Sequence, residues 1–100
     1  MTIAITREET AGGGRYVAEA DGRPAGVMTY QRPEKGRVVI DHTKVGDDFS
    51  GQGVGARLVA RAIDDARAEG FRITPVCSYA VRYFGKHPEA ADVLAKESPD

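Results

Sequence analysis

Residues 45–70 constrain the fold of this chain more than any other stretch, because a glycine-spaced turn runs directly into the pattern of an amphipathic helix. Gly51, Gly53 and Gly55 occupy alternate positions just before that helix. Glycines leave backbone N–H groups uncovered by side chains, and at a helix N-terminus these donors lie at the positive end of the helix dipole. The stretch therefore predicts a site for a phosphate or pyrophosphate group.

From Val54 onward, apolar residues recur at helical spacing, at Leu58, Val59, Ala62, Ile63 and Ala66. Charged residues fall mostly on the other faces, and Glu69–Gly70 supplies a C-terminal stop. One long helix with a single buried face is therefore expected immediately after the glycine turn.

The rest of the pattern predicts short strands and a second helix. Strands are expected over residues 3–5, 15–20, 25–30 and 38–45, with a loop over residues 7–14 and a tight turn at Asp21–Gly22. Residues 71–76 predict a further strand, in which Pro75 favours a sheet edge or a bulge because it cannot donate a ladder hydrogen bond. Ser78 predicts the cap of a helix that continues through Phe84 and ends at His87–Pro88.

A short final turn or helix is expected over residues 89–95, and residues 96–100 are expected to fray. The order of elements predicts an α+β fold in a single domain over residues 1–100. Its sheet is mixed but mostly antiparallel, and it packs against a long central helix and a shorter C-terminal helix.

Composition narrows the classes of partner. The net charge is −1 and the basic residues are scattered, which argues against a nucleic-acid partner. The only cysteine, Cys77, excludes an intrachain disulfide and favours a reducing, cytoplasmic location. No apolar run approaches the ~20 residues that a membrane-spanning helix needs. We expect no membrane partner and no metal, and a monomer or weak homodimer.

Two common nucleotide-binding motifs do not fit the glycine turn. In a dinucleotide fingerprint the third glycine comes one residue later, inside a parallel βαβ unit. A P-loop ends in Gly-Lys-Ser/Thr, whereas Ala56 and Arg57 follow Gly55 here. A glycine-rich flexible loop without a ligand is the remaining alternative.

The turn resembles motif A of the GNAT acyltransferase superfamily, Gln/Arg-x-x-Gly-x-Gly/Ala, with the motif glycines at Gly53 and Gly55. More narrowly, the chain resembles the minimal GNAT-like family of about 100 residues. The residues that carry this resemblance are 41–45 (DHTKV), 75–79 (PVCSY) and His87–Pro88. It extends over roughly residues 15–94. One departure is Ser50, which stands where the motif has Gln or Arg.

This resemblance implies a GNAT-like fold, acetyl-CoA as co-substrate and acetyl transfer to an amine, including a protein or peptide lysine. The implied pyrophosphate lies on the amides of the turn, and the pantetheine arm bonds to the nearby strand. The implied acetyl-CoA contacts are Thr43, Val45, Ser50, Gly51, Gln52, Gly53, Val54, Gly55, Ala56 and Arg57. For Arg57, a solvated surface arginine is an equally supported interpretation.

Three residues are candidates for catalysis. His42 can accept a proton from an amine or thiol, or it can be a strand histidine held by a backbone carbonyl. Strand alternation places Asp41 and His42 on opposite faces, so Asp41 is not expected to orient His42. Cys77 precedes a helix, where a thiolate is favoured and can carry an acetyl group, or it is a buried small apolar residue. By the resemblance Tyr83 is a general acid; core packing is its alternative.

Three functions follow from these alternatives. The first is an acetyltransferase with an open acceptor groove, because only a short strand and a loop are expected before Arg15 to form a wall of that groove. The second is a non-catalytic CoA-binding or protein-interaction module with the same fold. The third is a redox-sensing thiol protein that depends on Cys77.

Overall fold

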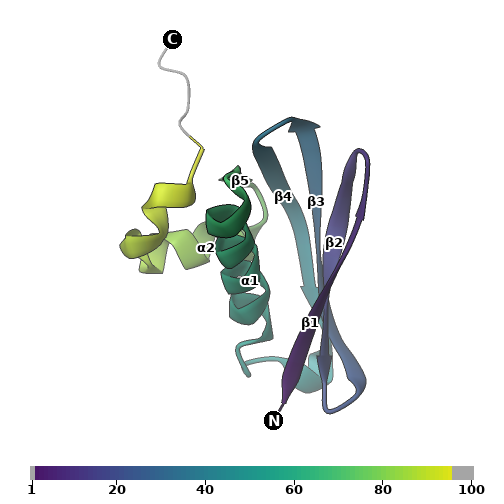
Figure 1. The fold of residues 1–100 in the computed structure, drawn as a ribbon. Coiled ribbons are helices and arrows are strands. Elements are labelled where there is room, and N and C mark those ends of the chain that lie inside the picture. The colour runs from purple at the N-terminus through teal and green to yellow at the C-terminus, as the bar shows by residue number, and fades with distance from the viewer. Residues whose placement is uncertain (1, 96–100) are drawn as a thin grey trace.

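The structure is a computed structural model and describes residues 2–95 of the 100-residue chain. It contains the strands β1 (Ile3–Thr10), β2 (Gly13–Ala20), β3 (Arg23–Glu34), β4 (Arg37–Val45) and β5 (Arg72–Pro75). The helices are α1 (Val54–Glu69) and α2 (Ser78–Lys86), with the short 3-10 helices η1 (Asp47–Phe49) and η2 (Pro88–Val93). One sheet runs in the order β1-β2-β3-β4-β5, and both α-helices lie on one side of β1–β4 (Figure 1).

The first four strands are antiparallel, and β5 runs parallel to β4 after the α1 crossover. This arrangement confirms the α+β prediction. The core lies between the sheet and α1, whose buried side chains recur as the sequence pattern predicts. Leu58, Val59 and Ala62 of α1 are fully buried together with Met28 and Ile40 of the sheet.

Strand β1 is longer than predicted, so the expected loop over residues 7–14 is wrong. β1 pairs with β2 without interruption as far as Thr10↔Gly13. Two contacts between elements explain the greater length of β1. The Arg7 side chain binds Asp65 of α1. Gly14 lacks a side chain, which lets β2 lie so close to the Glu8 carbonyl of β1 that a Cβ there would collide with it. The charged residues of this stretch, with Gly13 and Gly14, therefore belong to strands, and only Ala11 and Gly12 form a turn.

A β-bulge interrupts β4. Its register with β3 shifts so that Thr29 pairs with His42 while Tyr30 pairs with Ile40, which leaves Asp41 as the extra residue. Residues paired across a sheet share a face, and Thr29 also donates a hydrogen bond of 2.6 Å to Asp41. Asp41 and His42 therefore lie on the same outer face, and the predicted separation onto opposite faces is wrong. The bulge is the physical reason, because it resets strand alternation.

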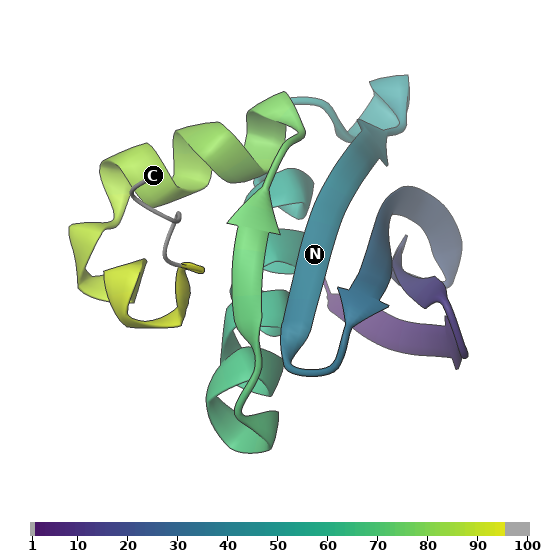
Figure 2. The ribbon, with the colours of Figure 1, turned by 90° about the horizontal axis from the view of Figure 1, so that it is seen from above.

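Strand β5 is the last strand of the sheet, as Pro75 predicted. It pairs with β4 only as far as Ile40↔Pro75, and the Ile40 carbonyl then accepts hydrogen bonds from the N–H groups of Val76 (2.9 Å) and Cys77 (3.1 Å). Beyond this point the chain turns away into α2, and the two strands separate (Figure 2). We call this divergence of β4 and β5 the fork.

Helix α2 is capped by Cys77 and not by Ser78, which corrects that prediction. The Cys77 sulfur accepts the Ala80 N–H at 3.4 Å, so the chain enters the helix one residue before the expected cap. The helix ends at His87, and η2 follows it, as the His87–Pro88 pair and the final-turn prediction required. The predicted fraying of residues 96–100 lies outside the described residues.

Candidate functional site

A cavity of about 490 Å³ opens beside the fork. Its wall is made by Val45 at the end of β4, by the glycine turn, by the first turn of α1 and by one face of α2. Elements that are distant in the sequence therefore meet around the stretch that predicted an anion site.

The glycine turn exposes backbone donors to this cavity. Gly51 and Gly53 have φ values of +77° and +80°, a left-handed conformation that glycine adopts at little cost. Gly53 is the N-cap of α1 and forms no side-chain cap hydrogen bond. The N–H groups of residues 54–56 have no intrahelical acceptor because they open the helix. They remain available to an anion, which the α1 dipole also favours.

Gly55 has a different structural role from the other two glycines. It is buried in the first turn of α1, and a Cβ there would collide with the ring of Tyr79. The absence of a side chain therefore lets α2 pack directly on the N-terminal turn of α1. This contact brings the α2 side chains to the cavity.

One face of α2 carries two aromatic and two cationic side chains. Tyr79, Arg82, Tyr83 and Lys86 are spaced three and four residues apart, so they share a helix face, and all four line the cavity. Arg82 and Lys86 are exposed, and within residues 2–95 neither forms an ion pair or hydrogen bond. The cavity thus combines backbone donors with two unpaired positive charges.

His87 extends this face beyond the end of α2. Its ring stacks on Tyr83 with centroids 4.1 Å apart and an interplanar angle of 22°. Its Nδ1 lies 2.9 Å from a carboxylate oxygen of Glu89, which can only accept, so Nδ1 carries the proton. Hydrogen bonds from its own backbone N–H and from His87 hold the pKa of Glu89 below its usual range. The imidazole is fixed in orientation at the cavity wall.

Eight of the predicted site residues line the cavity: Val45, Ser50, Gly51, Gly53, Val54, Gly55, Ala56 and Tyr83. Gln52 and Arg57 are exposed outside it. The Gln52 amide donates to the Asp48 carbonyl at 3.3 Å, and Arg57 lies in a separate hollow with Ile3 and Asp64.

Thr43 and Cys77 meet at the fork. The Thr43 Oγ1 and Cys77 Sγ share a hydrogen bond of 3.1 Å, and Thr43 is only 8% exposed. The Gly46 N–H donates towards β3, to Ala25 at 2.9 Å. Amide directions alternate along a strand, so the Thr43 and Val45 N–H groups point the opposite way, into the gap left by β5. At the fork, the hydrogen-bonded thiol of Cys77 therefore lies beside the part of the β4 edge that β5 does not pair with.

His42 lies on the opposite face of β4 from Thr43. It is exposed on the outer face of the sheet and is not part of the cavity wall. Asp41 beside it accepts hydrogen bonds from Thr29 and, at 2.8 Å, from Gln31, and these bonds hold the pKa of Asp41 below its usual range. The structure does not bring His42 together with Tyr83.

Sequence reasoning missed Arg82, Lys86 and His87 as site residues. His87 was interpreted only as a helix stop and part of the family resemblance. The available signal was the four-residue spacing of Arg82 and Lys86 beside Tyr79 and Tyr83, which places all four on one face of a predicted helix.

The sequence matches the family described as GCN5-related N-acetyl-transferase over residues 15–93. The chain belongs to this acetyltransferase family. In this GNAT protein residues 1–14 and 94–100 lie outside the match, so it leaves out β1 and the first two residues of β2. No protein in the curated set matches the sequence.

Solved structures share the fold. A GCN5-like protein from Staphylococcus aureus, solved by NMR, has a TM-score of 0.68 at 24% identity and covers 94% of this chain and 91% of its own. A GNAT family acetyltransferase from Elizabethkingia anophelis, solved with acetyl-CoA bound, has a TM-score of 0.64 at 17% identity and covers 86% and 74%. The IAA acetyltransferase from Bacillus cereus gives 0.66 at 17%, covering 88% and 75%.

Residues 2–95 contain no group of three or more His, Cys, Asp or Glu side chains placed to hold a metal ion. In the same part of the chain, neither helix has the length and apolar character that crossing a membrane requires.

Proposed function

We propose that this GNAT protein binds acetyl-CoA in the cavity beside the fork and transfers the acetyl group to an amine, with a protein or peptide lysine as the acceptor. One observation carries the proposal. The uncovered N–H groups at the start of α1 line the same cavity as the side chains of Arg82 and Lys86, which have no partner within residues 2–95. A ligand with several phosphates satisfies both.

The binding mode follows from the position of these donors. The pyrophosphate lies against the N–H groups of residues 54–56. The pantetheine arm extends along the unpaired edge of β4 and bonds to the backbone of Thr43 and Val45, as a further strand would. Ser50 replaces the longer motif residue, so backbone donors and the α2 cations hold the phosphates.

In the proposed transfer, the amine nitrogen attacks the thioester carbonyl carbon at the fork. The C–N bond forms, the C–S bond breaks and CoA leaves as a thiolate that takes a proton. Tyr83 lines the cavity and supplies this proton. His42 accepts the proton that the amine loses, from the outer face of the sheet. That face has no helix over it in residues 2–95, which suits an acceptor as large as a protein lysine.

Cys77 provides a second route, in which its sulfur first takes the acetyl group and releases CoA. The Ala80 N–H donates to this sulfur at the positive end of α2. An acetylated Cys77 peptide, trapped with acetyl-CoA alone and detected by mass spectrometry, distinguishes the two routes. If protein that turns over with an acceptor shows no such peptide after incubation with acetyl-CoA alone, the covalent route is contradicted and direct transfer remains.

Two measurements test the function in sequence. Acetyl-CoA at 100 times its Kd stabilises a single-site protein by about 2.7 kcal/mol, which raises the melting temperature. No rise contradicts the site itself. Thiol release is then followed with a panel of amines and lysine peptides, using wild type, His42→Ala and Cys77→Ala. Release that no acceptor stimulates contradicts the transferase.

A non-catalytic CoA-binding module is the second candidate, and one observation favours it. His42 lies outside the cavity that Tyr83 lines, so the two proposed proton-transfer groups are not assembled in one pocket. Stabilisation by acetyl-CoA without acceptor-dependent thiol release supports this module.

A further inference from the structure

We propose that Arg82, Lys86 and His87 form a dedicated site for the 3′-phosphate of CoA, which makes the protein select CoA over 3′-dephospho-CoA. The inference rests on the proposed function, because it assigns the part of acetyl-CoA that the α1 turn does not hold. It names three residues that take part in specificity and not in the chemistry of transfer.

The cavity wall is divided between two kinds of donor. The start of α1 offers a compact set of backbone N–H groups, which suits the pyrophosphate. The α2 face offers exposed charged side chains on a different element, at Arg82 and Lys86. CoA carries a pyrophosphate and a separate phosphomonoester on its ribose. Two spatially separate donor sets match two separate phosphate groups.

Arg82 and Lys86 have no partner within the described chain. Most arginines of the protein are neutralised by acids: Arg7, Arg15, Arg23, Arg32, Arg37, Arg61 and Arg67 all form ion pairs. Arg82 and Lys86 form none within residues 2–95, although they lie one helical turn apart and raise each other's energy. A doubly charged phosphate between them removes that repulsion and gains charge-assisted hydrogen bonds.

The ring of His87 is held in a fixed orientation. Tyr83 stacks on its ring, and Glu89 binds its Nδ1 at 2.9 Å, so the second ring nitrogen, Nε2, is left without an assigned partner. A ring held in this way loses little freedom when Nε2 bonds to a ligand. His87 therefore adds a pre-oriented imidazole nitrogen to the two cationic side chains of the wall.

The test measures the affinity of CoA and of 3′-dephospho-CoA by calorimetry at one salt concentration. Wild type is expected to bind CoA at least about tenfold more tightly, since two or three charge-assisted bonds depend on the 3′-phosphate. The double variant Arg82→Gln/Lys86→Gln is expected to reduce this ratio to within about twofold of one, while its affinity for 3′-dephospho-CoA stays within about threefold of wild type. His87→Asn is expected to reduce the ratio in part.

The control variant Arg15→Gln/Lys35→Gln removes the same charge from exposed positions outside the cavity. It is expected to keep the wild-type ratio, because exposed charges beyond a Debye length of about 8 Å are screened at physiological salt. Melting curves without ligand confirm that each variant is folded.

Each outcome separates this inference from the proposed function. Equal affinity of wild type for the two ligands overturns the 3′-phosphate site and leaves CoA binding intact. An equal loss of both ligands in the α2 double variant also overturns it, because the cations then serve the pyrophosphate. Binding of neither ligand by wild type overturns the proposed function together with the inference.

Discussion

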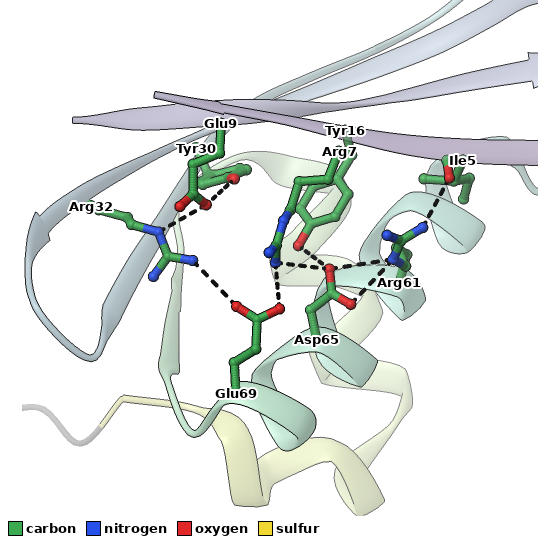
Figure 3. Close-up of polar contacts among 9 residues, drawn as sticks. All are labelled: Ile5, Arg7, Glu9, Tyr16, Tyr30, Arg32, Arg61, Asp65 and Glu69. Carbon is green, nitrogen blue, oxygen red and sulfur yellow. Dashed lines mark hydrogen bonds and ion pairs between the residues drawn. The ribbon is translucent and has the colours of Figure 1, made fainter. Parts of the chain in front are cut away.

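The surroundings of the two ends of α1 differ in how charged groups are paired. At the N-terminal end, backbone donors and the cations of α2 face a cavity without acidic partners in the described residues. At the C-terminal end, acids and bases from β1, β2, β3 and α1 bond to one another in a continuous network (Figure 3). The members of this network are Arg7, Glu9, Tyr16, Tyr30, Arg32, Arg61, Asp65 and Glu69.

Asp65 is the centre of that network. Its carboxylate accepts hydrogen bonds from Tyr16 (2.7 Å), Arg7 (3.2 Å) and Arg61 (3.2 Å), and Arg61 also donates to the Ile5 carbonyl at 2.9 Å. Burial, together with the bond to Asp65, raises the pKa of Tyr16 well above its usual range, so the phenol stays protonated. The network therefore fastens β1, which lies outside the family match, to the helix that carries the site.

One end of α1 thus stabilises the fold, and the other end is open to a ligand. Charges that are satisfied inside the fold hold the element in place and have no capacity left for a ligand. Charges and N–H groups that lack partners destabilise the free protein slightly and gain when an anion binds.

The largest effect is expected from Asp65→Ala at the C-terminal end. It removes the shared acceptor of two arginines and a tyrosine, and the free energy of unfolding should fall by about 2–4 kcal/mol. Urea denaturation measures this loss. The exposed Arg15–Glu8 pair supplies the control, because Glu8→Ala should cost less than about 1 kcal/mol. A tenfold loss of acetyl-CoA affinity in folded Asp65→Ala protein would contradict the division between the ends.

The next effect is expected at the N-terminal end, from Gly55→Ala. The new methyl group displaces the Tyr79 ring from the first turn of α1, so acetyl-CoA affinity should fall by about tenfold, or about 1.4 kcal/mol. Gly85→Ala is the matched control, since nothing lies within 4 Å of a Cβ there. It should stabilise the protein by about 0.5–1 kcal/mol, as alanine does in an exposed helix, and leave binding unchanged. Calorimetry and melting curves measure both variants.

A smaller effect is expected from pH, through Glu9. The hydrogen bond from Tyr30 is the main cause that holds the pKa of Glu9 below its ordinary value of 4.5, and Arg32 adds to it. A carboxylate with a depressed folded-state pKa stabilises the protein above its unfolded-state pKa, and that stability is lost as pH falls through the folded-state value. Urea midpoints should therefore decrease below about pH 5, and Glu9→Gln should flatten this slope. If the urea midpoint falls with pH at the same slope in wild type and in Glu9→Gln, Glu9 does not contribute to the pH dependence of stability.

The smallest effect is expected from Arg57→Gln. Arg57 belongs to the first turn of α1 but lies in a hollow away from the cavity. Acetyl-CoA affinity should change by about twofold or less, since the exposed Arg57 charge lies outside the cavity and is screened by water and salt. A change of tenfold or more would place Arg57 in the phosphate site after all.

Much of the fold followed from local patterns. The presence of β2 to β4, the helical spacing after Val54, the stop at Gly70 and the edge position of Pro75 all depend on neighbouring residues, and each was predicted correctly. The length of β1 was not, because Arg7 and Glu9 resemble loop residues until their partners on α1 and β3 are known.

The candidate site divides in the same way. The glycine turn and Tyr83 were identified before the structure, and both line the cavity. The contribution of α2 was missed because Arg82 and Lys86 become site residues only when Tyr79 packs on Gly55. The prediction of the face on which Asp41 lies was wrong, because a single-residue bulge leaves no mark in the sequence pattern.

The sequence by itself determined the α+β order, the family resemblance and the uncovered N–H groups before α1, because periodicity, glycine conformation and helix ends are local physical properties. Only the tertiary structure decided which charges are neutralised and which face a cavity. That outcome depends on pairings across 49 to 62 residues of chain, such as Tyr16 with Asp65 and Arg7 with Glu69, which no local pattern encodes.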